Sequence, residues 1–237
     1  MTVVEHLEEL RYRLLVSVAA VVLGAILAYI FYNPILRLLK HPLDQGGHIG
    51  NARVDDLYVT GIATALILRV KVAAFAGFVF ALPVVLFQFW RFITPGLEQN
   101  EKRFALPFVL SSVGLFGAGA YMAFWVAPYG IHFLLAFAGP PLKPLIHFTE
   151  YINFIMLMVL VFGLSFEYPL VLVFLAYADI LSSAKLRKWR RYAVFATVVF
   201  AALATPQQDP FSNLALAVPL YLLYELTILV IRFAMKK

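Results

Sequence analysis

Acidic and amide residues inside apolar stretches are the groups of this sequence most able to do chemistry in a membrane. Glu167 lies in the apolar segment 152–178, where an ionised carboxylate facing lipid would be costly. It is therefore expected to face protein or water, either as a polar site for a partner or substrate or as a neutral structural residue beside a kink at Pro169. Gln88, in segment 70–92, would belong to the same intramembrane polar site or pack between helices.

Two further acids lie in or beside the last apolar segment. Glu225 lies in the apolar segment 211–233 and could pair with Arg232, two helical turns further on, or extend toward the interface. Asp209 lies between Pro206 and that segment, where capping of a turn is its expected role.

Acidic residues also form two groups that flank the first and second apolar segments: Glu5, Glu8 and Glu9, and then Glu98 and Glu101. Carboxylates beside an apolar side chain such as Phe92 can hold guanidinium groups through bidentate hydrogen bonds. An alternative is that Glu98 and Glu101 interact favourably with the dipole of the helix that follows them. The sequence leaves both explanations open.

Several chemistries are excluded or disfavoured by what the sequence lacks. It contains no Cys, and its five His lie in separate segments, so a metal site among them is not expected. Metalloprotease, hydrolase and phosphate-loop motifs are missing. We expect no cofactor and no enzymatic activity. The net charge of +6 lacks the basic face that would indicate nucleic-acid binding.

The elements that position these residues are membrane-spanning helices. The chain is 63% hydrophobic and 14% charged, with 22 Phe, far more apolar than a soluble domain. We expect an all-α, polytopic membrane protein with a single domain over residues 1–237. Its six spans are expected at residues 14–32, 70–92, 104–127, 152–178, 192–204 and 211–233.

Proline and turn residues set the limits of these spans. Pro128 is expected to break the long third apolar run, and Pro42 to punctuate an external segment over residues 33–69. Spans five and six are expected to be short. About 13 residues at 1.5 Å each give span five roughly 20 Å, against a hydrocarbon thickness of roughly 30 Å, so we expect local thinning of the bilayer.

The distribution of Lys and Arg orients the chain. With six spans, most cations fall at the two termini and in the loops near residues 93–103 and 179–191. By the positive-inside rule these segments face the cytosol, so both termini are expected there.

Four motifs in order resemble the TatC family, the multispanning subunit of the twin-arginine protein translocase. They are HLEELRYRL at residues 6–14, FITPGLEQNEKR at 92–103, FGLSFEYPL at 162–170 and TPQQDPF at 205–211. The resemblance covers nearly the whole chain. The sequence departs from the family by an additional residue between Pro206 and Asp209, which leaves the alignment of Asp209 open.

The resemblance implies a receptor that binds twin-arginine signal peptides and organises TatA- and TatB-like single-span partners for export of folded proteins, driven by the proton gradient. It implies a bacterial inner-membrane location and a hetero-oligomer with several copies in contact with membrane lipids. The resemblance assigns signal-peptide binding to Glu9, Arg11, Phe92 and Glu101. It assigns the intramembrane acid to Glu167 and partner docking to Leu203 and Thr205. Pro42 corresponds to a proline of the family's external loop.

One other class of function remains open from the residues alone. A proton-coupled small-solute carrier could use Glu167 as its proton relay. Carriers commonly contain repeats and discontinuous helices, and no convincing internal repeat is found in this sequence. A purely structural assembly factor is a weaker third possibility.

Overall fold

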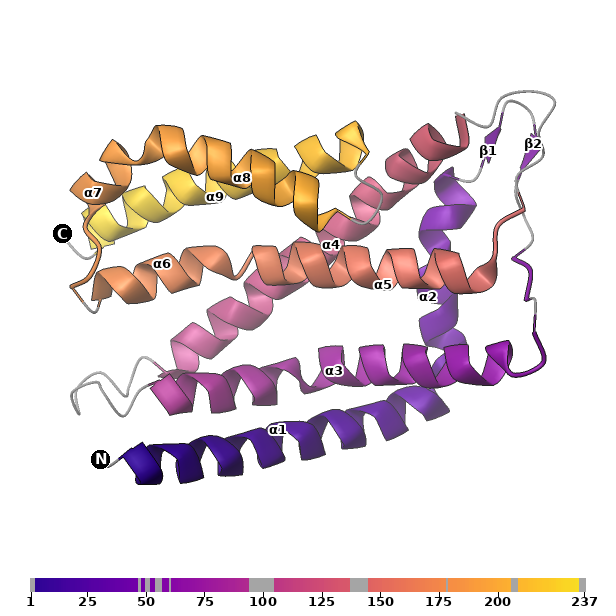
Figure 1. Ribbon diagram of the computed structural model, residues 1–237, viewed down its shortest axis with the longest axis horizontal. Helices are drawn as coiled ribbons and strands as arrows, with labels where there is room; N and C mark the ends of the chain where they lie inside the picture. Colours follow the sequence, from indigo (N-terminus) through magenta and orange to yellow (C-terminus); the bar gives the residue numbers. More distant parts are fainter. Residues whose placement is uncertain are drawn as a thin grey trace. The chain divides into compact units, whose positions relative to one another are not determined.

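The structure is a computed structural model that describes residues 3–46, 48–49, 52–53, 57–59, 61–93, 105–136, 145–177, 179–205 and 209–234. Nearly all of these residues are helical, which confirms the expected all-α class (Figure 1). The elements are α1 (Val3–Ile30), α2 (Tyr32–Gly46), β1 (His48–Ile49), β2 (Ala52–Arg53), α3 (Thr64–Ile93), α4 (Ala105–Ala136), α5 (Phe148–Ser165), α6 (Tyr168–Tyr177), α7 (Ser183–Lys188), α8 (Arg190–Ala204) and α9 (Pro210–Ala234).

Five candidate spans in the described part of the chain are long and apolar enough to cross a membrane. They are Val4–Ile30, Thr64–Phe92, Leu106–Ala136, Phe148–Tyr177 and Pro210–Phe233. The expected fifth span corresponds to α8, which has 15 residues and would be about 22 Å long. The protein is therefore a multi-pass helical membrane protein, and the count of six spans stays a prediction.

The chain divides into two compact units. The first contains Met1–Leu39 and Val59–Gly114, and the second contains Lys40–Tyr58 and Leu115–Lys237. The expectation that both belong to one membrane domain stays a prediction.

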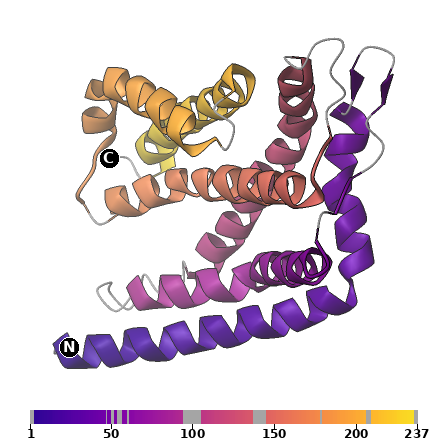
Figure 2. The same cartoon turned by 45° about the vertical axis from the view of Figure 1, so that its right-hand side comes forward.

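In the first unit, α1 and α3 run side by side in opposite directions (Figures 1 and 2). Small residues allow this close approach: a Cβ atom added to Gly24 would lie 2.5 Å from the carbonyl oxygen of Gly77. One turn further on, Ala28 packs with Ala73 and Ala76 in a buried cluster. Small residues at the contact are typical of membrane helices, where close packing replaces the hydrophobic effect as the driving force.

In the second unit, helices α6 and α7 pack against α9. Its residues Tyr224, Ile228 and Ile231 form a buried cluster with Ala176 of α6 and Leu186 of α7. The Tyr224 hydroxyl donates to the Leu186 carbonyl at 2.7 Å, so α7 is tied to α9. Helix α8 lies along α9 in both views (Figures 1 and 2).

Proline positions correct three expectations. Helix α4 continues through Pro128 to Ala136, and α2 continues through Pro42 to Gly46, so neither proline breaks its helix. The two proline-containing helices approach each other closely here: a Cβ atom added to Gly46 would lie 2.3 Å from the Pro128 carbonyl oxygen. Helix α9 contains Pro219 and still has 25 residues, so the expected short sixth span is wrong.

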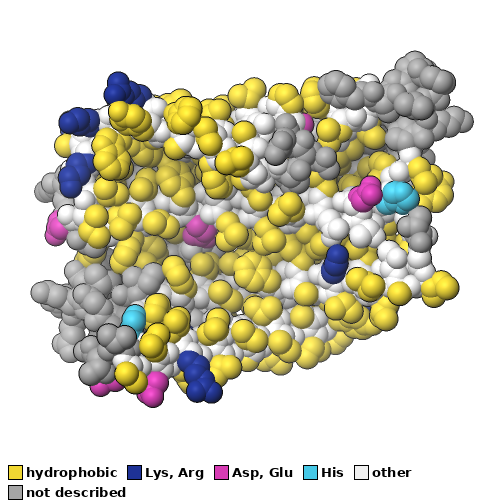
Figure 3. All heavy atoms as spheres, viewed as in Figure 1, with side chains coloured by type: hydrophobic (Ala, Val, Ile, Leu, Met, Phe, Trp, Pro, Cys, Tyr) yellow, Lys and Arg dark blue, Asp and Glu magenta, His cyan; other side chains and the backbone are white. Residues whose placement is uncertain are grey.

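Hydrophobic side chains form most of the face shown in Figure 3, and Lys and Arg side chains gather over α7 and the start of α8. The exposed cations of this region are Lys185, Arg187, Lys188, Arg190 and Arg191. A broad apolar surface with charges near helix ends is what a bilayer-embedded protein requires.

Candidate functional site

The start of α1 lies beside the end of α3. The His6 and Phe92 rings stack with their centroids 4.4 Å apart and an angle of 16° between the planes. Two motifs separated by 86 positions are thus brought together, because α1 and α3 are antiparallel neighbours. Of the four predicted signal-peptide residues, Glu9 and Arg11 lie on the turns of α1 that follow His6.

Glu9 is held by a neighbour on its own helix. Its Oε1 accepts a hydrogen bond from Arg13 Nε at 3.1 Å and also pairs with Arg13 Nη2. Its Oε2 is shielded from solvent and has no hydrogen-bond partner among the residues that the structure describes. A shielded acceptor without a donor is costly, and a guanidinium N–H that reached this oxygen would satisfy it.

Arg11 and Arg13 differ in environment although they are two residues apart. Arg11 is exposed, whereas the Arg13 side chain retains only 11% of its accessible surface. Arg13 was not among the predicted site residues, and its contact with Glu9 was not expected. The four-residue spacing of an acid and a base on one helix was the signal that could have found it.

Glu101, the fourth predicted signal-peptide residue, lies outside the described residues, together with Glu98. Its role stays a prediction.

Glu167 lies where the fourth candidate span is interrupted. Helix α5 ends at Ser165 and α6 begins at Tyr168. Pro169 has no N–H to continue the ladder, and the Glu167 carbonyl accepts from Leu170 N at 3.0 Å. The expected kink beside Pro169 is therefore present, and the half-buried Glu167 side chain lies next to it.

Gln88 is half-buried on α3, in the first unit. Glu167 belongs to the second unit. That the two form one intramembrane polar site stays a prediction.

The two predicted docking residues on α8 differ sharply in exposure. Leu203 is 75% exposed, and Thr205 is 2% exposed. The Thr205 hydroxyl donates to the Ala201 carbonyl at 3.0 Å and contacts the Asn213 side chain. Thr205 therefore fixes the end of α8 against the start of α9, and Leu203 has the accessible side chain.

Asp209 caps α9, as expected for a turn residue. Its Oδ1 accepts from Ser212 N at 2.7 Å, the contact that an N-cap residue makes with the third helical position. Asp209 is 3% exposed. Within the described part of the chain, its Oδ2 and the Ser212 hydroxyl have no hydrogen-bond partner. Both lie near Gly130, where an added Cβ atom would be 2.9 Å from Ser212 Oγ.

Glu225 pairs with Arg190 and not with Arg232. Arg190 Nη2 lies 2.6 Å from Glu225 Oε2, and the Tyr221 hydroxyl donates to Oε1 at 2.9 Å. The ion pair joins the start of α8 to α9. The expectation of a partner two turns along the same helix is wrong because the antiparallel neighbour α8 supplies a closer cation.

An Arg residue at the opposite end of the α1–α3 pair was missed from the sequence. The Arg69 guanidinium carbon lies 4.5 Å from the ring centroid of Tyr29 and 5.0 Å from that of Tyr32. Cation–π contacts of this kind hold the start of α3 against the α1–α2 junction.

Comparison with known proteins identifies the kind of molecule that this fold and its motifs define. Residues 5–219 match the family described as Sec-independent protein translocase protein (TatC). A solved structure described as that of the twin-arginine translocase receptor TatC superposes with a TM-score of 0.78 at 34% identity, covering 97% of this chain and 99% of the other. A second structure of that receptor, in DDM, gives a TM-score of 0.79 over 95% of this chain.

Curated relatives with the same description agree. The Frankia casuarinae protein is 40% identical over 97% of this chain and 65% of its own length. The Carboxydothermus hydrogenoformans protein is 36% identical over 100% of this chain and 95% of its own length. The Aquifex aeolicus protein is 34% identical over 100% and 97%.

The molecule is thus a multi-pass membrane protein of protein transport, a class that is not enzymatic. The chain belongs to the TatC family and is a component of the twin-arginine protein translocase. This assignment favours protein transport over the small-solute carrier.

Proposed function

We propose that this chain is the receptor subunit that binds twin-arginine signal peptides at the end of the α1–α3 pair where His6 stacks on Phe92. The single observation that carries the proposal is that stack, with its 4.4 Å separation. It supports a site in which an apolar ring and a carboxylate, Glu9, are presented together by two adjacent helices.

The chemistry of the proposed site is recognition of guanidinium groups. Glu9 has one oxygen engaged by Arg13 and one without a described hydrogen-bond partner, so an arginine of the peptide would supply a missing donor. Glu101, which follows α3 in the sequence, would provide a second carboxylate. Phe92 would contact the apolar part of the peptide, and exposed Arg11 would limit which charges approach.

The proposed topology places this site in the cytosol of a bacterium. Six spans, with α8 as the fifth, and both termini on the cytosolic side of the inner membrane would account for the cations over α7 and the start of α8. Cargo would then meet the receptor before export, which the proton gradient drives.

The same proposal assigns partner sites to the remaining residues. Glu167, at the α5–α6 interruption, and Gln88 would offer polar groups to a helix within the bilayer, where such groups form interhelical hydrogen bonds. Leu203, exposed at the end of α8 and positioned by Thr205, would contact TatA- or TatB-like single-span partners in an assembly with several copies of each subunit. Pro42 would contribute to the external surface.

A peptide-binding measurement tests the proposed receptor site. The purified protein in lipid nanodiscs is titrated with a fluorescent twin-arginine peptide and with a twin-lysine peptide. Because a hydrogen bond to a charged group contributes about 1.5–3 kcal/mol, Glu9→Gln should lower the affinity for the twin-arginine peptide by roughly 10-fold or more. Glu101→Ala should lower this affinity to a similar extent. Glu8→Gln, an exposed acid next to Glu9 on the same helix, is the matched control.

The proposal fails if Glu9→Gln and Glu8→Gln have equal affinity for the peptide. It also fails if the twin-lysine peptide binds as tightly as the twin-arginine peptide. Binding would then require only a positive charge and not the hydrogen-bonding geometry of a guanidinium group. Normal thermal unfolding of the Glu9→Gln protein would show that any lost affinity does not come from lost folding.

A further inference from the structure

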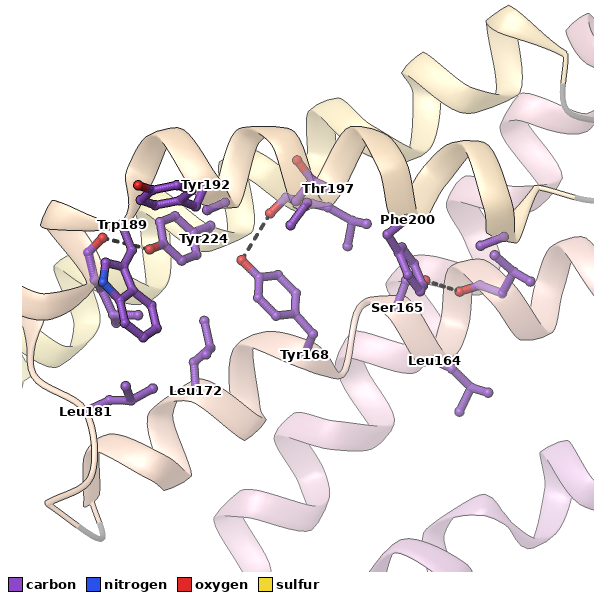
Figure 4. Close-up of a pocket in the computed structure, with 16 residues that line it drawn as sticks. Leu164, Ser165, Tyr168, Leu172, Leu181, Trp189, Tyr192, Thr197, Phe200 and Tyr224 are labelled. Carbon is purple, nitrogen blue, oxygen red and sulfur yellow. Dashed lines mark hydrogen bonds between the residues drawn. The ribbon is translucent and has the colours of Figure 1, made fainter.

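An apolar groove runs between α5–α6 and α8 in the second unit (Figure 4). Its volume is about 850 Å³. Leu164 and Ser165 line one end together with Phe200, and Trp189 and Tyr192 line the other (Figure 4). Small residues on α8, Ala193 and Ala196, form part of the wall between these ends.

Three hydroxyl groups that border the groove are engaged within the protein. The Tyr224 hydroxyl donates to the Leu186 carbonyl at 2.7 Å, and the Tyr168 hydroxyl lies 3.5 Å from the Leu220 carbonyl. The Ser165 hydroxyl contacts the Val161 carbonyl. None of the described residues that line the groove is charged. The groove therefore suits an apolar occupant that forms no hydrogen bonds.

The end of the groove at the α7–α8 junction has the opposite character. Trp189 and Tyr192 are 53% and 57% exposed, and aromatic residues of this kind sit at membrane–water interfaces. Arg191 Nη2 donates to the Tyr192 hydroxyl at 2.7 Å, and its guanidinium carbon lies 4.7 Å from the Tyr192 ring centroid. This contact holds a cation at the mouth of the groove, and exposed Lys188 precedes Trp189 in the sequence.

We infer that the groove binds one anionic phospholipid, with an acyl chain between α6 and α8 and its phosphate at Arg191 and Lys188. The charge at the mouth complements a phosphate, and the apolar interior complements the chain. Helix α8, with 15 residues, is about 22 Å long, more than the roughly 15 Å of one leaflet of hydrocarbon. The groove is thus long enough to accommodate a single chain.

The lining favours a lipid chain over a transmembrane helix. Helices associate in membranes partly through interhelical hydrogen bonds, and the hydroxyl groups of Ser165, Tyr168 and Tyr224 are already engaged within the protein. A flexible chain can follow the irregular walls.

Lipid retention by the purified full-length protein tests the role of the cations. Native mass spectrometry follows competition between phosphatidylglycerol and phosphatidylcholine of equal chain length. Because each basic residue near an anionic surface contributes a roughly additive attraction, Lys188→Gln with Arg191→Gln should reduce the preference for phosphatidylglycerol by roughly 30-fold. Arg232→Gln, an exposed cation on the last turn of α9, should leave the preference unchanged. Equal loss in both proteins, or no loss in the double variant, overturns the inference.

Fluorescence quenching tests the position of the chain. Phosphatidylglycerol with brominated chains should quench the Trp189 emission, measured as the difference between the wild type and Trp189→Phe, more than brominated phosphatidylcholine does. Ala196→Phe fills the groove and should remove that difference, whereas Val198→Phe, on an exposed position of α8 outside the groove, should keep it.

Unchanged quenching in Ala196→Phe overturns the inference. So does an outcome in which Ala196→Phe abolishes binding of a purified TatA-like partner while lipid retention and quenching stay normal, because the groove would then belong to a helix. Neither readout depends on signal-peptide affinity, so the inference can fail while the proposed receptor function holds.

Discussion

Replacing Gly77 with Ala should destabilise the protein through the α1–α3 contact. A Cβ atom at Gly77 would lie 2.3 Å from the Ala25 backbone nitrogen and 2.5 Å from its Cα atom, whereas non-bonded heavy atoms prefer about 3.5–4.0 Å. The obstacle is backbone and not a movable side chain, so the two helices must separate by roughly 1 Å. Overpacking of this kind costs about 1–3 kcal/mol.

The matched control is Gly117→Ala on α4, where nothing lies within 4 Å of the added Cβ atom. There the substitution should stabilise by up to about 1 kcal/mol, because Ala is the better helix former. Thermal unfolding of both variants in one detergent measures the difference. At roughly 2–4 °C per kcal/mol for a chain of this size, Gly77→Ala should lower the Tm by about 2–12 °C and Gly117→Ala should not lower it. Equal Tm values for the two variants would refute the packing argument.

Two contacts of α9 give smaller effects on the same thermal unfolding measurement. Asp209→Ala removes the cap on Ser212 N and should lower the free energy of unfolding by about 1 kcal/mol. Asp209→Asn keeps an acceptor oxygen and should lower it less. A larger loss of stability in Asp209→Asn than in Asp209→Ala would contradict the capping role. Glu225→Gln removes the ion pair with Arg190, whose side chain is 48% exposed. It should therefore lower the free energy of unfolding by no more than about 1 kcal/mol. A much larger fall in Tm would mean that the pair is less hydrated than its exposure indicates.

The sequence predicted the helices well where apolar length alone decides them, and less well where proline is involved. Pro128, Pro42 and Pro219 all lie inside helices. A proline removes one backbone hydrogen bond, but packing against neighbouring segments can maintain the helix around it. The close fit of Gly46 on the Pro128 carbonyl is such a tertiary contact, and no local pattern reveals it.

The site residues show the same division between local and tertiary information. Capping by Asp209 is a contact between residues three positions apart, and the sequence predicted it. The stack of His6 on Phe92 and the pairing of Arg190 with Glu225 join different helices. Periodicity identifies which residues share a face of one helix, but the partner of that face depends on how the helices pack.

Helix α8 should thin the bilayer beside it, because contacts at both ends prevent it from lengthening. Its first residue, Arg190, pairs with Glu225 on α9, and Thr205, which follows its last residue, is fixed to Asn213. Its 15 residues span about 22 Å, some 8 Å less than a typical hydrocarbon core of roughly 30 Å. Spin labels on the exposed residues Phe195 and Leu203 can report depth. The predicted result is a shallower hydrocarbon layer beside α8 than beside α1, whose 28 residues span a full bilayer. Equal depth profiles at the two helices would show that α8 tilts or extends at no cost to the lipid, and would contradict the proposed mismatch.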